Sequence, residues 1–259
     1  MANYVAVTRS QHQGLRWKRF ESYHFAGTDA LAPLVVQELP RACMHLPIGF
    51  TVQGQAYMPV GLLGLATGHN LLVGADGRWV GGYVPACYRS YPFALGTNAD
   101  TGEQVLCVDT DSGLVNEFSG EAFFQEDGTP APAVQEVLGF LTQVQQNRQA
   151  TARVCQALQA ANVIQPWPLS VPGPEGEARV VNGLFRIDEA ALNALPAADF
   201  EALRRAGALP VAYCQLLSMQ HLAHLQALHR QHQQSDDWLS VPAGELDLEF
   251  LNDDTIKFG

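Results

Sequence analysis

Charged residues are scarce in this chain of 259 residues, where Asp, Glu, Lys and Arg make up 16% of the sequence. Soluble domains usually carry roughly 25%. Hydrophobic residues reach 47%, which is enough to build a buried core and excludes an intrinsically disordered chain. Basic residues are the scarcer kind, since 15 Lys and Arg face 26 Asp and Glu for a net charge of −11. A protein that neutralises nucleic-acid phosphates needs the opposite balance, so we expect no nucleic-acid partner.

Cysteine is present but never in closely spaced pairs. The five cysteines lie at least 20 residues apart: Cys43, Cys87, Cys107, Cys155 and Cys214. Without a CxxC pair, a zinc ribbon and a thioredoxin-like centre are excluded. Scattered cysteines are typical of small buried hydrophobes in a reducing compartment. Residues 1–24 contain no continuous apolar stretch of the kind a secretory signal needs, so we expect a cytoplasmic protein.

Long hydrophobic runs are also missing. Residues 42–75 contain no charged residue, but two prolines, six glycines and several amide side chains interrupt them. A membrane-spanning helix needs about 20 consecutive, predominantly apolar residues. The short apolar pieces in this stretch are better explained as buried strands, and we expect no membrane span.

The local motifs of common catalytic and cofactor sites are absent. The sequence contains no GxxxxGK[ST] phosphate loop, no GxSxG or HExxH, and no His-x-Asp or His-x-Glu, and the glycines of residues 61–68 have the wrong intervals for a dinucleotide site. We therefore expect no cofactor and no motif-borne catalytic residue.

Strand and turn patterns dominate the first half of the chain. Short or alternating apolar runs predict strands at 4–8, 48–52, 55–65 and 103–109, with two more strand-like pieces flanking the turn residues 75–77. We also expect a short strand at 24–26, a helix over 31–47 that is interrupted or restarted at Pro40, and a short helix within 84–93.

Helical spacing dominates the second half. A long helix is predicted to start at 129–130, and Asp188 is a good N-cap for a helix over 189–195. Residues 196–207 carry acids in the first turn and arginines in the last, which matches the helix dipole. A proline-rich loop is expected around 166–174, a strand at 179–187, and one further helix over 208–234.

Together these patterns predict an α+β fold. Residues 1–239 are expected to form one domain, strand-rich at 1–128 and mainly helical at 129–239, followed by an acidic tail at 240–259. Residues 235–259 contain seven acids against Lys257 alone, and residues 245–251 alternate acidic and apolar side chains as a half-buried strand does. Two interpretations stay open: a strand docked on the body, or an extended arm that adds to a partner's sheet.

Four histidines lie close together in the last predicted helix: His221, His224, His229 and His232. On one helix they would share an arc of about 140° and form two i,i+3 pairs. Leucines share the same arc and no carboxylate or cysteine interleaves. We therefore interpret the cluster as the polar end of an amphipathic helix and expect no metal site, with a metal-bearing helix as the alternative.

Residues 77–93 hold the other concentration of functional side chains. Aromatic rings supply rigid contact area, and an arginine supplies a planar fork of donors for carboxylates or carbonyls. A groove for a peptide would use these residue types, whereas a buried core would also use the rings. The candidate ligand-binding residues are Trp79, Tyr83, Arg89, Tyr91 and Phe93.

The same stretch resembles the SapC family. The matching pieces are ESYHFA, LAPLVVQELPRA, residues 58–93, EQVLCVD, GEAFFQEDGTP, NGLFRIDEAALNAL and LRRAGALPVAYCQLLSM, which cover roughly residues 2–220 in order. The family is linked to export of a surface-layer protein. The resemblance implies a neighbourhood of tryptophan-halogenase-like and dioxygenase-like enzymes and TonB-dependent receptors, and it supplies no catalytic residues.

We therefore expect a soluble, non-enzymatic accessory protein that binds a peptide or protein substrate for a modification or export system. The alternative is a metal-assisted, peptide-modifying enzyme that uses the histidine-rich helix. The expected partners are the peptide or protein substrate and a halogenase- or dioxygenase-like modifying enzyme. A homodimer is the default assembly, because two-fold pairs are the commonest among soluble oligomers.

Overall fold

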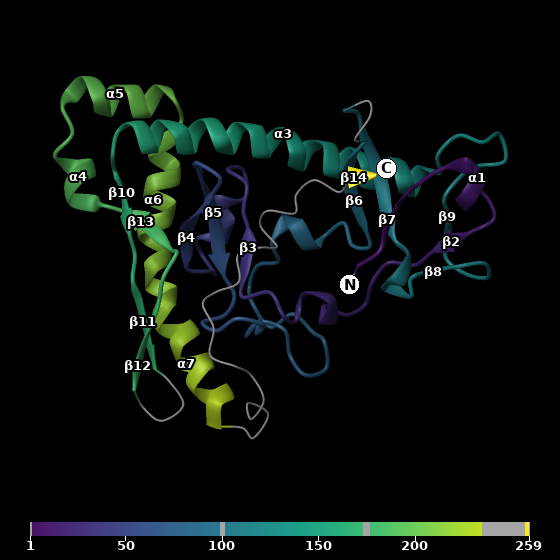
Figure 1. The fold of residues 1–259 in the computed structure, drawn as a ribbon, viewed down its shortest axis with the longest axis horizontal. Helices are drawn as coiled ribbons and strands as arrows, with labels where there is room; N and C mark the ends of the chain where they lie inside the picture. Colours follow the sequence, from purple (N-terminus) through teal and green to yellow (C-terminus); the bar gives the residue numbers. More distant parts are fainter. Residues whose placement is uncertain (1, 99–101, 173–176, 235–256, 259) are drawn as a thin grey trace. The chain divides into compact units, whose positions relative to one another are not determined.

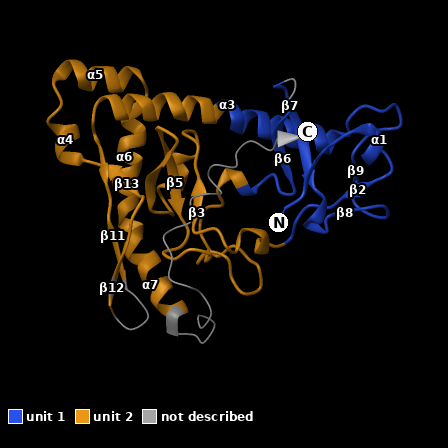
Figure 2. Cartoon of the chain, in the orientation of Figure 1, with its two compact units in different colours: residues 1–21, 88–146, 249–259 blue, residues 22–87, 147–248 orange. Residues whose placement is uncertain are grey.

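The structure is a computed structural model, and it describes residues 2–98, 102–172, 177–234 and 257–258 (Figure 1). Sheets predominate in the N-terminal half and helices in the C-terminal half, which confirms the predicted α+β class. The chain divides into two compact units (Figure 2). Unit 1 comprises residues 1–21, 88–146 and 249–259, and unit 2 comprises residues 22–87 and 147–248. Each unit thus draws on both halves of the sequence, and a single domain over 1–239 stays a prediction.

Unit 1 contains two small sheets. The first has the strand order β1-β7-β6-β14, in which β1, β7 and β6 are antiparallel and β14 runs parallel to β6. Its strands are β1 (Tyr4–Ala6), β6 (Phe93–Asn98), β7 (Gln104–Asp109) and β14 (Lys257–Phe258). The second sheet has the order β8-β2-β9 and consists of β2 (Arg16–Trp17), β8 (Val115–Asn116) and β9 (Glu121–Ala122). Short helical pieces complete the unit: α1 (Arg9–His12), η3 (Thr110–Ser112) and the first part of α3 (Pro132–Ala160).

Aromatic rings form the core of unit 1. Trp17 packs edge-on against Phe93 with ring centroids 4.7 Å apart, and Phe93 meets Phe123 at 5.9 Å. Val108 and Val134 close the cluster, so β2, β6, β7 and α3 all contribute to it. Large rings bury much apolar area per residue, which lets short strands hold a core.

Unit 2 is built around a five-stranded antiparallel sheet of order β10-β13-β4-β5-β3. Its strands are β3 (Leu31–Pro33), β4 (Ile48–Gln53), β5 (Ala56–Leu62), β10 (Ile164–Pro166) and β13 (Phe185–Ile187). A separate hairpin consists of β11 (Leu169–Pro172) and β12 (Ala178–Val181). The helical elements are η1 (His24–Ala26), α2 (Leu39–Ala42), the rest of α3, α4 (Glu189–Asn193), α5 (Ala197–Arg205), α6 (Ala208–Ser218), η4 (Met219–His221) and α7 (Leu222–Gln234).

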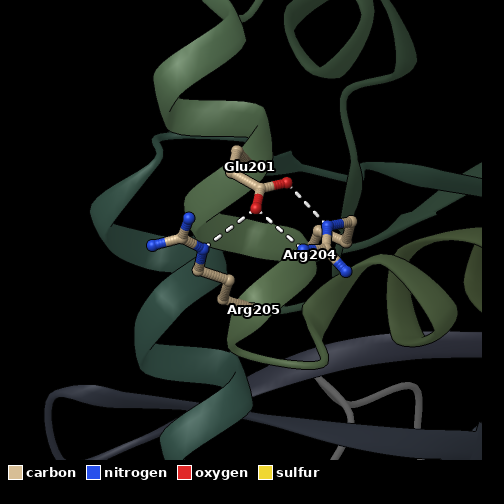
Figure 3. A network of polar contacts seen from close by, with 3 residues as sticks. All are labelled: Glu201, Arg204 and Arg205. Atoms are coloured by element: carbon tan, nitrogen blue, oxygen red, sulfur yellow. Dashed lines mark hydrogen bonds and ion pairs between the residues drawn. The ribbon is translucent and has the colours of Figure 1, made fainter.

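Several predicted helix ends are confirmed. The Asp188 carboxylate accepts a hydrogen bond from Ala191 N at 3.0 Å and caps α4. At the end of α5, Arg204 and Arg205 both bind Glu201 (Figure 3). Hydrogen bonds from Arg204, and to a smaller extent from Arg205, lower the pKa of the Glu201 carboxyl. Gly207 follows with φ +70°, a conformation that glycine adopts without strain.

Four expectations about local structure are wrong in whole or in part. Residues 24–26 form a 3-10 turn, and Leu31–Pro33 form the buried strand β3, because a short apolar run does not separate a buried strand from a helix. The expected restart of a helix at Pro40 is confirmed, since α2 has this proline in its first turn. Pro166 and Pro172 end strands instead of making a loop; β10 is an edge strand, where a missing amide is tolerated. The expected helix over 208–234 is broken at η4, where Ser218 Oγ donates to Gln215 O, a bond of the type that bends helices.

The five cysteines are free thiols. Cys43, Cys107 and Cys155 are buried, and Cys87 and Cys214 are half-buried, which agrees with their interpretation as small apolar residues. Burial raises the pKa of the Cys155 thiol to about 12 and that of Cys107 to about 11. Within the acidic tail, Lys257 and Phe258 are described as β14, while residues 240–256 and 259 lie outside the described residues.

Candidate functional site

Three aromatic rings lie together in unit 2. The rings of Tyr23 and Trp79 have centroids 5.5 Å apart, and those of Tyr23 and Phe25 are 6.0 Å apart. All three residues are half-buried, and the indole Nε1 of Trp79 is on the buried side. The next residue, Val80, is 61% exposed. We call Tyr23, Phe25, Trp79 and Val80 the aromatic surface.

The backbone beneath the aromatic surface is fixed by a tight turn. Tyr23 N donates to Gly77 O at 2.8 Å, which joins the two segments that carry the rings. Gly77 has φ +77°, and a Cβ there would collide with the Ser22 hydroxyl, so only glycine fits. The bridge between Val73 and Trp79 closes this turn and confirms the turn predicted at residues 75–77. The rings are therefore presented from a backbone with little freedom.

Tyr83 contributes to the fold of unit 2 through its hydroxyl group. Its side chain is buried, and the hydroxyl donates to Glu38 Oε2 at 2.8 Å. Ala86 N donates to the same oxygen at 2.8 Å, and Val35 N donates to Oε1 at 2.8 Å. Three hydrogen bonds thus hold the buried Glu38 carboxylate and tie residues 83–86 to the start of α2.

Cys87 directly follows Ala86 in the chain. Burial raises the pKa of this thiol well above its ordinary value, and the carboxylates of Glu38 and Asp29 raise it further, while Arg148 acts in the opposite direction. Because the thiolate is the nucleophile, a thiol held protonated is a poor one. Cys87 is thus suited to packing.

The remaining three predicted ligand-binding residues belong to unit 1. Phe93 is 3% exposed and lies in the core of that unit. Tyr91 is half-buried, packs edge-on against Phe20, and donates its hydroxyl to Asp109 Oδ2 at 3.4 Å. Burial and Asp109 raise the pKa of the Tyr91 hydroxyl. Arg89 is exposed. The structure therefore divides the five predicted residues between the two units, and a groove lined by all five stays a prediction.

Sequence reasoning missed Tyr23 and Phe25. Both lie in the piece ESYHFA, where two aromatic residues flank His24. That spacing was the available signal, but nothing in it connects residue 23 with residue 79. The contact depends on the tertiary fold.

The four histidines do not converge. His221 is in η4 instead of α7, and its Nε2 atom lies 3.1 Å from Cys43 O. His229 is buried, whereas His224 and His232 are exposed. His224, His229 and His232 all lie in α7, and only His221 lies in η4. Within residues 2–98, 102–172, 177–234 and 257–258, no group of three or more His, Cys, Asp or Glu side chains is placed to hold a metal ion.

No helix in the described part of the chain combines the length and the apolar character needed to cross a bilayer. The uncharged stretch over residues 42–75, which was the strongest candidate by hydropathy, forms β4, β5 and the turns after them.

A family model for SapC matches residues 7–225. The chain belongs to the SapC family. The match includes the three rings of the aromatic surface and the Glu38 carboxylate, and it confirms the resemblance drawn from the sequence pieces. No curated protein and no solved structure matches the chain.

Proposed function

We propose that this SapC-family protein is a non-enzymatic accessory protein whose aromatic surface binds an extended peptide or an unstructured segment of a substrate protein. The observation that carries the proposal is the group of three half-buried rings on the turn of unit 2, with the exposed Val80 next to Trp79 in the chain. Half-buried rings leave their edges and faces available without a large loss of side-chain entropy on binding.

The chemistry of the surface favours an apolar or aromatic ligand. Tyr and Trp are enriched at binding hot spots because one rigid ring covers a large contact area. The nearby exposed charges, Arg78 and Asp76, pair with each other at 3.4 Å. They supply a polar rim and little net charge, so recognition rests on ring contacts and on hydrogen bonds to the peptide backbone.

Two buried or half-buried ionisable groups of unit 2 have structural roles. The Glu38 carboxylate accepts three hydrogen bonds from the protein itself. The Cys87 thiol is held protonated by burial and by neighbouring carboxylates, which raise its pKa. Both groups stabilise the fold that carries the rings. The metal-assisted alternative finds no support in the positions of the histidines.

The family resemblance supplies the proposed setting. Members are associated with halogenase-like and dioxygenase-like enzymes, with export, and with TonB-dependent receptors. We therefore infer that the bound peptide is presented to such a modifying enzyme or to an export system. The five free thiols fit a reducing compartment such as the cytoplasm.

Selection from a displayed random peptide library on the purified full-length chain tests the proposal. We expect enriched peptides to carry aromatic or branched apolar residues. Calorimetric titration of the best synthetic peptide should show that Trp79→Ala weakens binding by about 30-fold, the effect of losing a hot-spot residue worth about 2 kcal/mol.

Tyr213 provides the matched control. It is 44% exposed in the same unit but lies on α6, outside the aromatic surface. Tyr213→Ala should leave the affinity within about twofold, since residues outside the contact contribute little. Failure of the library to enrich any peptide, or equal weakening by both variants, would contradict the proposal.

A further inference from the structure

Two of the five thiols lie against each other in unit 2, where α6 packs on the short helix α2. Cys43 follows α2 directly as its C-cap, and Cys214 lies in the middle of α6. Their thiols share a hydrogen bond, although Cys214 follows Cys43 by 171 positions. The fold therefore brings together a pair of thiols that no close spacing in the sequence indicates.

Two further hydrogen bonds hold the same helical face on the segment that begins with Cys43. Ser218, one turn after Cys214, accepts at its Oγ from Ile48 N at 2.9 Å. His221, two turns after Cys214, lies with its Nε2 3.1 Å from Cys43 O. Residues spaced by i, i+4 and i+7 share one face of a helix, so the contact between the thiols agrees with the packing on either side of it.

The two thiols differ in their exposure to solvent. Cys214 is half-buried, and Tyr213 and Leu217 beside it on α6 are 44% and 65% exposed, so a small oxidant can reach this thiol. Cys43 is buried, which makes Cys214 the first of the two to react. A disulfide needs its sulfur atoms about 2.05 Å apart. From hydrogen-bond contact, rotation about the Cα–Cβ bonds brings the sulfur atoms together while α2 and α6 stay in place.

We propose that Cys43 and Cys214 form a reversible disulfide, which joins the end of α2 to α6 when a low-molecular-weight disulfide such as oxidised glutathione is in excess. Cys214 first loses its proton, and its thiolate attacks one sulfur of the oxidant and releases one glutathione. The Cys43 thiolate then attacks the Cys214 sulfur of this mixed disulfide and releases the second glutathione. Two protein thiols are thus oxidised, and one disulfide of the oxidant is reduced to two thiols.

The environment of Cys214 determines how fast the disulfide forms. Burial, and after it the neighbouring Cys43, raise the pKa of the Cys214 thiol to about 12. Because the thiolate is the attacking species, the exchange at neutral pH should take hours. The pair therefore responds to a lasting change in the thiol–disulfide balance. Once formed, the link closes a long loop, and such a link stabilises a fold by restricting the unfolded chain.

The test incubates the folded full-length chain with oxidised glutathione, blocks the remaining thiols with iodoacetamide, and digests the chain with trypsin without reduction. Each cysteine lies on a different tryptic peptide, because at least one arginine separates it from the next. Mass spectrometry should find residues 42–78 linked to residues 206–230, and dithiothreitol should separate them. The oxidised chain should unfold at a urea midpoint about 1 M higher than the reduced chain.

Two alanine variants assign the effect to the pair. Cys214→Ala should lose both the linked peptides and the rise in the midpoint. Cys87 is also a half-buried thiol of unit 2, and Cys87→Ala is the matched control that should keep both. Each variant is compared with its own reduced form, so a change in its basal stability does not affect the result. None of these measurements uses a bound peptide, so they test this site separately from the aromatic surface.

Three outcomes would overturn the proposal. In the first, the folded chain stays reduced or carries glutathione on Cys214 without the linked peptides. In the second, the disulfide joins other cysteines, or the expected link appears only in the urea-unfolded chain. In the third, the linked chain unfolds at the same midpoint as the reduced chain or at a lower one, which would mean that the disulfide distorts the packing of α2 and α6.

Discussion

The cores of the two units are stabilised mainly by different interactions. Unit 1 is held by an aromatic cluster in which Trp17 and Phe123 each pack against Phe93 in a T-shaped arrangement. The core of unit 2 is mainly leucine, isoleucine and valine, with Phe50 and Trp167 among them, and buried polar side chains connect its elements. Gln215 shows this best: its Oε1 accepts from Ile187 N at 2.9 Å and its Nε2 donates to Ile48 O at 3.0 Å, which joins α6 to β13 and β4. Unit 1 also contains such a group, the buried Asp109 carboxylate, which accepts from Asn3 N and Asp111 N.

The difference has a consequence for function. Ring packing tolerates small adjustments, whereas a buried hydrogen bond has a defined length and direction. Unit 2 uses such bonds at Glu38 and Gln215, and it is also the unit that carries the aromatic surface. The two segments that carry the rings are themselves joined by the hydrogen bond from Tyr23 N to Gly77 O.

The largest expected effect comes from the core of unit 1. Phe123 is fully buried, so Phe123→Ala should lower the free energy of unfolding by about 3 to 5 kcal/mol. Phe118, in the turn between β8 and β9, is 87% exposed, and Phe118→Ala should change the free energy of unfolding by no more than about 0.5 kcal/mol. Urea unfolding of both variants checks this contrast. Equal destabilisation would contradict the assignment of the aromatic core.

A smaller effect is expected from the buried carboxylate of unit 2. Glu38→Gln places an amide NH2 against one of the donors that now bind the carboxylate. It should lower the free energy of unfolding by about 2 to 3 kcal/mol. Tyr83→Phe removes one donor and leaves the other two bonds intact, so the free energy of unfolding should fall by about 1.5 kcal/mol. Urea unfolding gives the order of the two; a larger loss for Tyr83→Phe would reverse the roles assigned here.

The smallest effect is a pH dependence to which His12 of unit 1 contributes, beside His69 of unit 2, whose pKa burial also lowers. Burial lowers the pKa of His12, so between that value and the ordinary pKa of about 6.5 the unfolded chain binds a proton that the folded chain does not. Stability should therefore fall as the pH drops from 7.5 to 5.5, and His12→Gln should reduce this slope. The exposed His224 is the control, and His224→Gln should keep the natural slope. An unchanged slope in His12→Gln would contradict the prediction.

Local patterns predicted local structure well. Asp188 caps α4 as its residue type indicates, the arginines of α5 lie in its last turn, and β4, β5 and β7 follow their apolar runs. These features depend on interactions within a few residues. The predictions for Pro166 and Leu31 were wrong because both depend on pairing with a strand elsewhere in the chain. Pro166 ends the edge strand β10, which pairs with β13, and Leu31 begins the buried strand β3, which pairs with β5.

The candidate site shows the same limit. Trp79 was singled out by its residue type, while its neighbour Tyr23 lies 56 positions earlier and meets it only through the fold. Phe93 has the same residue character as a binding aromatic but belongs to the core of unit 1. Composition identifies rings that can bind a ligand; the fold decides which of them face solvent.

The most direct test of the central claim compares two exposed valines of unit 2. Val80 lies on the aromatic surface and is 61% exposed, and Val180 lies on β12 and is 56% exposed. With the library-selected peptide, Val80→Asp should weaken binding at least tenfold and Val180→Asp should not, while both unfold at the midpoint of the natural chain. Equal affinity of the Val80→Asp variant and the natural chain would contradict the claim that the aromatic surface binds the peptide.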